Sequence, residues 1–136
     1  MDRSNLIDLA LFILRLAVGV VFIAHGLQKV FGMFGGSGID GLSRMLESLG
    51  VMPPVLWAWV AAIGELAGGT LLVLGIFPRL SALVIGMIMM AAIVLVHWKN
   101  GYFASNGGFE YPLLNLMCSI AIILAGGGKY SIFNKL

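Results

Sequence analysis

Two charged residues lie near the middle of long apolar stretches of this sequence. Arg15 falls within the apolar segment 6–31 and Glu65 within the apolar segment 55–77. A lone charge at the centre of a membrane-spanning helix costs roughly 2.5–3.5 kcal/mol, even on the lenient insertion scale. Counted from helix ends on the same side of a membrane, the two residues reach similar depths, where a guanidinium can bind a carboxylate through two hydrogen bonds. The sequence therefore predicts a buried ion pair between Arg15 and Glu65.

We interpret this pair as the floor of a polar chamber, because further polar residues are expected above it in the same half of the molecule: His25, Lys29, His97, Glu110 and Asn115. Basic and acidic groups around an apolar cavity can bind a ligand that has carbonyl or hydroxyl oxygens, and imidazole and carboxylate groups can relay protons. The pattern predicts catalytic roles for His25, Glu65 and His97, and ligand binding by Arg15, Lys29, Glu110 and Asn115.

A structural interpretation of the same residues stays open. A buried ion pair can fix the register of two helices without binding a ligand. The outer polar residues can equally lie at the membrane interface, where they would contact water or lipid headgroups. The two interpretations differ in whether a cavity lies beside Glu65.

Other cofactor chemistry has little support in the pattern. His25 and His97 are the only histidines, and no accompanying motif marks them as axial ligands of a haem. A metal site built from His25, His97 and Glu110 would require a loop geometry that the sequence does not specify, and no metal is predicted. Cys118 is the sole cysteine, so the chain cannot form an internal disulfide. No phosphate-binding loop or dinucleotide-binding motif occurs.

The composition identifies the environment in which these residues must fold. The chain has 136 residues, of which 60% are hydrophobic and only 10% are charged, and its mean hydropathy is +1.04. Ordinary soluble domains contain about 25% charged residues. A net charge of +2 without a basic stripe gives no indication of nucleic-acid binding. We therefore expect one membrane-embedded domain over residues 1–136, with the lipid bilayer as its main partner.

Four apolar segments, at about 6–31, 55–77, 80–97 and 111–127, are candidates to cross the membrane. Because lipid offers no hydrogen-bond partners for free backbone groups, these segments should be helices, which predicts an all-α, integral membrane four-helix bundle. Between the first two segments, apolar residues recur at helical spacing from Ile39 to Leu49 with polar residues between them. This pattern predicts a short amphipathic helix at the membrane interface or over the bundle.

The few charges outside these segments predict the orientation. With four spans, the termini and the second connection share one side, which then carries Arg3, Arg79, Lys129 and Lys135, whereas the other side carries Arg44 and Lys99. This excess of basic residues favours both termini in the cytoplasm. Glycine-rich helix faces allow the chain to form homo-oligomers without requiring it.

Several strings of residues resemble those of the DoxX family of small bacterial membrane proteins. They are RLAVG at 15–19, HGLQKVFG at 25–32, GELAGGTLLVLG at 64–75 with Pro78 and Arg79 after it, then His97, Glu110 and GGGKYS at 126–131. The likeness covers nearly the whole chain. It departs from the family at Gly127, where the family usually has proline, and at 132–134, where it usually has an aspartate.

The resemblance implies a multi-pass protein of the bacterial inner membrane that belongs to a redox system of thiol, sulfur or quinone chemistry. The leading hypothesis is that the polar chamber binds a quinone-like molecule while electrons come from another redox enzyme subunit. One alternative is a non-catalytic scaffold for soluble redox enzymes. A small transporter is a further alternative, although the polar residues are sparse for that role.

Overall fold

The computed structural model describes residues 2–134, and the predicted all-α membrane fold is confirmed. Five α-helices follow one another along the chain: α1 (Arg3–Phe31), α2 (Gly38–Ser48), α3 (Pro54–Leu74), α4 (Pro78–Ala92) and α5 (Glu110–Ala125). The last turns of α4 continue as a π-helix, Ile93–His97, and a 3-10 turn, Trp98–Asn100. Lys135, which contributed to the predicted orientation, lies outside the described residues.

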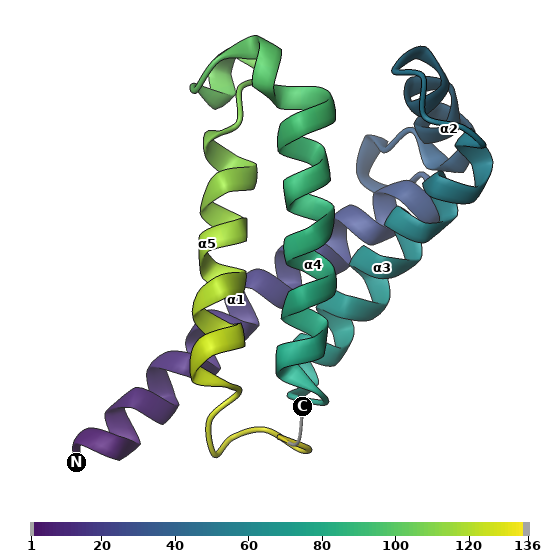
Figure 1. Ribbon diagram of the computed structural model, residues 1–136. Coiled ribbons are helices and arrows are strands. Elements are labelled where there is room, and N and C mark those ends of the chain that lie inside the picture. The colour runs from purple at the N-terminus through teal and green to yellow at the C-terminus, as the bar shows by residue number, and fades with distance from the viewer. Residues whose placement is uncertain (1, 135–136) are drawn as a thin grey trace.

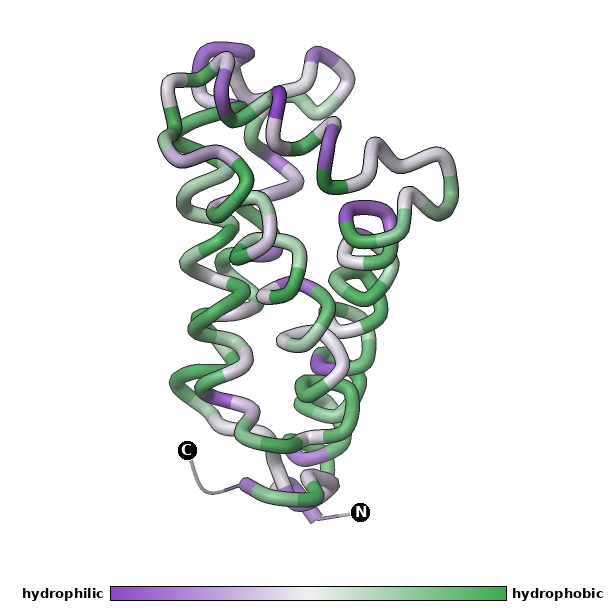
Figure 2. Tube along the Cα trace, turned by 90° about the vertical axis from the view of Figure 1, so that its right-hand side faces the viewer, coloured by the Kyte–Doolittle hydropathy of each residue, from purple (hydrophilic) through white to green (hydrophobic). Residues whose placement is uncertain are grey.

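Three helical segments are long and apolar enough to cross a bilayer: Arg3–Phe31, Pro54–Leu74 and Pro78–Asn100. Helix α5 is also apolar but has only 16 residues, fewer than the roughly 20 that cover the hydrocarbon core. Hydrophobic residues line the middle of the long helices, and hydrophilic residues gather toward the two ends of the molecule (Figure 2). This distribution is the one expected for a protein whose middle is surrounded by lipid.

The long helices form two pairs that pack on each other. Helix α1 packs along α3 and α4 packs along α5, while further contacts join α3 to α4 and α1 to α5. In Figure 1 the α1–α3 pair runs obliquely to the α4–α5 pair. Both termini lie at one end of the molecule, which we call the terminal end, and α2 and the α4–α5 connection lie at the other, which we call the loop end (Figure 1).

Glycine residues bring the backbones of α1 and α3 into direct contact. A Cβ atom on Gly69 would lie 2.7 Å from the carbonyl oxygen of Gly19 and 2.8 Å from the backbone nitrogen of Ile23. One on Gly26 would lie 2.7 Å from the Cα of Leu66. No side chain fits at such distances, so these glycines fix how closely and in which antiparallel register the two helices pack.

The predicted amphipathic helix is α2, and it covers the loop end of the bundle. It packs against α3 and α1, and Leu42 is buried at 7% exposure while Arg44 and Glu47 are exposed. The alternation of apolar and charged residues thus distinguishes the face of α2 that points toward the bundle from the face that points away from it.

Candidate functional site

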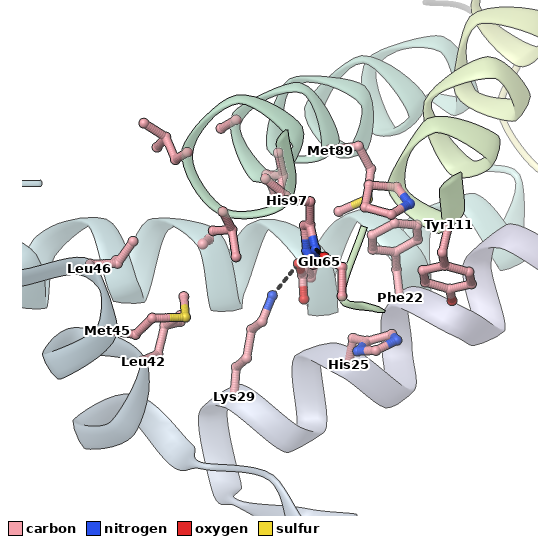
Figure 3. Close-up of a pocket in the computed structure, with 18 of the residues that line it drawn as sticks. Phe22, His25, Lys29, Leu42, Met45, Leu46, Glu65, Met89, His97 and Tyr111 are labelled. Carbon is pink, nitrogen blue, oxygen red and sulfur yellow. Dashed lines mark hydrogen bonds and ion pairs between the residues drawn. The ribbon is translucent and has the colours of Figure 1, made fainter. Parts of the chain in front are cut away.

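A cavity of about 410 Å³ lies toward the loop end, between α1, α2, α3, the end of α4 and the start of α5. Most of its lining is apolar. Four of the seven residues predicted for the site line it, each from the helix that the sequence assigned to it: His25, Lys29, Glu65 and His97 (Figure 3). Its volume falls in the range of roughly 300–1,000 Å³ that is typical of small-molecule sites.

Glu65 of α3 forms an ion pair with Lys29 of α1 across this cavity (Figure 3). The Lys29 ammonium donates a hydrogen bond to Oε1 of the carboxylate. The Glu65 side chain is 1% exposed and that of Lys29 is 27% exposed, so the lysine extends from the more open part of the cavity to a carboxylate at its inner wall. Because each isolated charge would be costly here, their pairing explains why both can lie inside an apolar bundle.

The second oxygen of the same carboxylate is unpartnered. Oε2 of Glu65 is buried, and no group within residues 2–134 donates a hydrogen bond to it. A buried carboxylate oxygen without a donor is costly, because it has lost water and gained no partner. The site therefore has an unused acceptor beside a partly available ammonium donor.

His97 enters the cavity from the π-helix at the end of α4. Its Nδ1 lies 2.7 Å from the carbonyl oxygen of Gly107 in the α4–α5 connection, and Asn100 donates to the same carbonyl at 3.1 Å. A carbonyl oxygen can only accept, so Nδ1 must carry the proton. In the neutral imidazole, Nε2 is then the acceptor nitrogen. Short π-helical segments of this kind often occur at functional sites.

His25 lies on the opposite side of the cavity, near the start of α5. Its ring is 6.2 Å from that of Tyr111, with the planes tilted by 48°, and both residues line the cavity. Tyr111 was not among the predicted site residues. The packing of α5 on α1 brings it beside His25.

Two segments whose contribution the sequence did not reveal line the cavity toward the loop end. Leu42, Met45 and Leu46 of α2 line it (Figure 3), as do Ala104, Gly107 and Gly108 of the α4–α5 connection. The apolar face of α2 was visible in the sequence, but the helix on which it packs was not. These segments reduce the access of water to the Lys29–Glu65 pair.

The predicted ion pair between Arg15 and Glu65 is wrong. Arg15 is fully buried, but it donates from Nη1 to the carbonyl oxygen of Leu72 at 3.1 Å and from Nη2 to that of Tyr130 at 3.0 Å. In the antiparallel register set by Gly19 and Gly69, the part of α3 beside Arg15 is about two turns from Glu65. Arg15 therefore lies outside the cavity lining and attaches the segment after α5 to the α1–α3 pair.

Glu110 and Asn115 are also absent from the cavity lining. Oε1 of Glu110 accepts a hydrogen bond from the backbone nitrogen of Ala104 at 2.7 Å, which holds the short turn in the α4–α5 connection. The Asn115 side chain of α5 is buried, and its Nδ2 donates a hydrogen bond to the carbonyl oxygen of Tyr111 at 3.0 Å. The structure thus gives both residues backbone partners on or next to their own helix.

The cluster has the composition of a small-molecule site rather than a metal centre. Within residues 2–134, no three His, Cys, Asp or Glu side chains are grouped so that they could hold a metal ion. An ion pair, two imidazoles and a phenol instead surround an apolar space. Fold and site together define a helical membrane protein with a polar pocket inside its bundle.

Comparison with known proteins assigns this architecture to a family. The DoxX family model matches residues 10–98, and the chain belongs to that family. It is 32% identical over 119 residues, 88% of this chain and 81% of the relative, to the protein named putative oxidoreductase CatD of Bacillus subtilis. It is 33% identical over 87 residues, 64% of this chain and 58% of the relative, to the inner membrane protein YphA of Escherichia coli. No solved structure gives a significant match.

The relatives support a bacterial membrane location. Besides the inner membrane protein, an uncharacterized membrane protein of Mycobacterium tuberculosis, Rv3486, is 26% identical over 134 residues, 90% of this chain and 78% of the relative. Together with three helical segments long enough to span a bilayer, these similarities identify a membrane protein of the DoxX family.

Proposed function

We propose that the protein is the membrane component of a redox system and that its cavity binds the ring of a quinone-like molecule. The family and the name of the Bacillus subtilis relative support the redox association. The mixture of an apolar space with a few convergent polar groups supports a flat apolar ligand that carries oxygen atoms at its edge.

The unpartnered Oε2 of Glu65 is the observation that carries this proposal. A hydroxyl of a quinol would donate a hydrogen bond to this oxygen. The buried acceptor would then have a donor, which would offset the cost of its lost hydration. The Lys29 ammonium, which is partly available, would donate to a carbonyl oxygen of the oxidised form. One pair of side chains thus provides a partner for each redox state.

Quinone reduction requires two electrons and two protons for each molecule of quinol formed. Cys118 is the sole cysteine of the chain, so an internal dithiol cannot supply the electrons. We propose that a partner enzyme that oxidises a thiol or sulfur compound supplies them. The two protons would come from the loop end, where the rings of His97 and His25 would pass them into the cavity, and they would reach the ring oxygens through Lys29 and Glu65.

Quinone binding to the purified protein tests the proposal. We expect a tail-free benzoquinone or naphthoquinone to bind to the wild type, and we expect Glu65→Gln to weaken binding by about tenfold, because an amide pairs poorly with the Lys29 ammonium. His25→Gln should weaken binding as well, since it removes an imidazole from the wall. Glu47→Gln is the matched control, because Glu47 is exposed on α2 and away from the cavity.

Two results would contradict the proposal. The first is absence of quinone binding to a folded wild-type protein. The second is a Glu65→Gln variant that binds as tightly as the wild type but accumulates to lower levels in the membrane. The second result would indicate the scaffold alternative, in which the Lys29–Glu65 pair serves only to hold α1 and α3 together.

We also propose that α5 crosses the membrane as a fourth span and that the terminal end faces the cytoplasm. Arg3, Arg79 and Lys129 belong to segments at that end, and basic residues are enriched in cytoplasmic connections. In a Cys118→Ser background, a single cysteine at Asn106 should react in intact cells with a maleimide that cannot cross the inner membrane. A cysteine at Asn5 should react only after the cells are broken, and the reverse pattern would overturn the orientation.

A further inference from the structure

A second cavity, of about 480 Å³, adjoins the polar chamber. It lies among α2, α3 and α4, and every side chain that lines it is apolar or aromatic. Five residues line both cavities: Leu46, Ala61, Ile88, Ala91 and Leu95. The two spaces are therefore neighbours separated by a shared boundary, and two of the five boundary residues are alanines with short side chains.

This second cavity, which we call the side groove, opens on the outer surface of membrane-spanning helices. Trp57 and Val60 of α3 and Met87 of α4 line it, and these side chains are 46%, 49% and 57% exposed. All three residues belong to helical segments long enough to cross a bilayer. In a bilayer, the side groove would therefore open toward the acyl chains.

The two adjoining cavities differ in chemistry along the line that leads from the side groove across their shared boundary to Lys29. The inner cavity has the Lys29–Glu65 ion pair at its wall, whereas the side groove offers no charged side chain to a ligand. The α4–α5 connection and α2 lie over the inner cavity at the loop end. A molecule with a polar ring and a long apolar chain would match this path, with its ring at Lys29 and its chain in the side groove.

We infer that the ligand of the polar chamber is a quinone with a long prenyl or alkyl chain, which enters sideways from the bilayer between α3 and α4 and leaves its chain in the side groove. The inference rests on the proposed quinone function. A chain that moves from lipid into an apolar groove stays in an apolar medium, whereas entry from the aqueous side would require the chain to pass through water.

The test compares two quinones that share one headgroup, one with a long prenyl chain and one without a chain. Val60→Phe would narrow the side groove, because Val60 lines that groove but not the polar chamber. Ala121→Phe is the control, because Ala121 is an exposed residue of α5 that lines neither cavity. Binding is measured by titration of the purified protein in lipid nanodiscs, and folding is checked by thermal unfolding.

We expect Val60→Phe to weaken binding of the long-chain quinone by about tenfold and to leave the affinity for the tail-free quinone within about twofold of wild type. Ala121→Phe should change neither affinity. Val84→Phe provides a second test if Val60→Phe lowers the yield of folded protein, because Val84 also lines the side groove but not the polar chamber.

Equal effects of these variants on both quinones, or no effect on either, would overturn the lateral path while leaving the quinone site intact. Failure of the wild type to bind even the tail-free quinone would instead overturn the proposed function together with this inference. The two quinones therefore separate an error about the path from an error about the ligand.

Discussion

Lys29 donates a hydrogen bond to one oxygen of the Glu65 carboxylate and leaves the other oxygen without a partner. The pair joins α1 to α3 in the part of the bundle that faces the cavity. An ion pair with one unused acceptor differs from a fully satisfied structural pair, because binding of a donor can still stabilise it. This asymmetry supports the proposed ligand site over a simple link between two helices.

Removing one member of the pair should destabilise the protein more than removing both. In Lys29→Met the buried Glu65 carboxylate loses its only cation, so we expect a loss of about 1–3 kcal/mol in the free energy of unfolding. The double variant Lys29→Met/Glu65→Leu should recover part of that loss. Unfolding by SDS in mixed micelles measures these values, with Lys99→Met as an exposed control. Additive effects of the two single substitutions would contradict the coupling.

Arg15 should stabilise the fold through its shape as well as its charge. Lysine would keep the charge but could not donate to the carbonyls of both Leu72 and Tyr130 from a planar group. We expect Arg15→Lys to lower the free energy of unfolding by about 2 kcal/mol. Arg79→Lys is the control, since Arg79 is exposed and makes one long hydrogen bond of 3.5 Å to the carbonyl of Leu124. Equal stability of the two variants would refute this role.

The close contact between α1 and α3 should not tolerate a methyl group at residue 69. A Cβ at residue 69 would meet backbone atoms at 2.7 and 2.8 Å, so Gly69→Ala should separate the helices and destabilise the protein by about 1–3 kcal/mol. Gly86→Ala in α4 is the matched control, because its Cβ would find its nearest neighbour at an ordinary 3.6 Å and alanine favours a helix. The measurement is thermal unfolding in detergent, and a neutral Gly69→Ala would contradict the close packing.

His97 should be protonated on Nδ1 in its neutral form. The chain has two histidines, so nitrogen NMR of protein labelled in histidine gives a simple spectrum, and His97→Asn assigns the signals. At alkaline pH we expect the Nδ1 signal of His97 to be that of a protonated nitrogen and the Nε2 signal that of an acceptor. A proton on Nε2 would mean that the hydrogen bond to Gly107 is not formed in solution.

The sequence predicted most of the fold because hydropathy and the spacing of apolar residues are local signals. The four apolar segments correspond to α1, α3, α4 and α5 with boundaries that differ by a few residues, and the apolar positions of α2 appeared at helical spacing. Whether α5 crosses the bilayer stays a prediction, since its 16 residues are fewer than those of the three longer segments.

The partner of Glu65 was mispredicted because depth along a helix does not determine which residues meet. Counting from helix ends placed Arg15 and Glu65 at one level. The glycines at 19, 26 and 69 instead set a register in which Lys29 lies beside Glu65. The acceptors of Arg15 are backbone carbonyl groups, one of them in the segment after α5. Every residue has a backbone carbonyl, so the sequence does not indicate which of them accept hydrogen bonds from Arg15.

The hydrogen bond from Arg15 to the carbonyl oxygen of Tyr130 has a consequence for the order in which the protein folds during synthesis. Ribosomes synthesise α1 before residue 130, so the guanidinium lacks one of its two acceptors until the segment after α5 has been made. During that interval the first helix carries an incompletely hydrogen-bonded cation. The segment after α5 can therefore pack on α1 only after all five helices have been synthesised, and this packing gives Arg15 the second of its two acceptors.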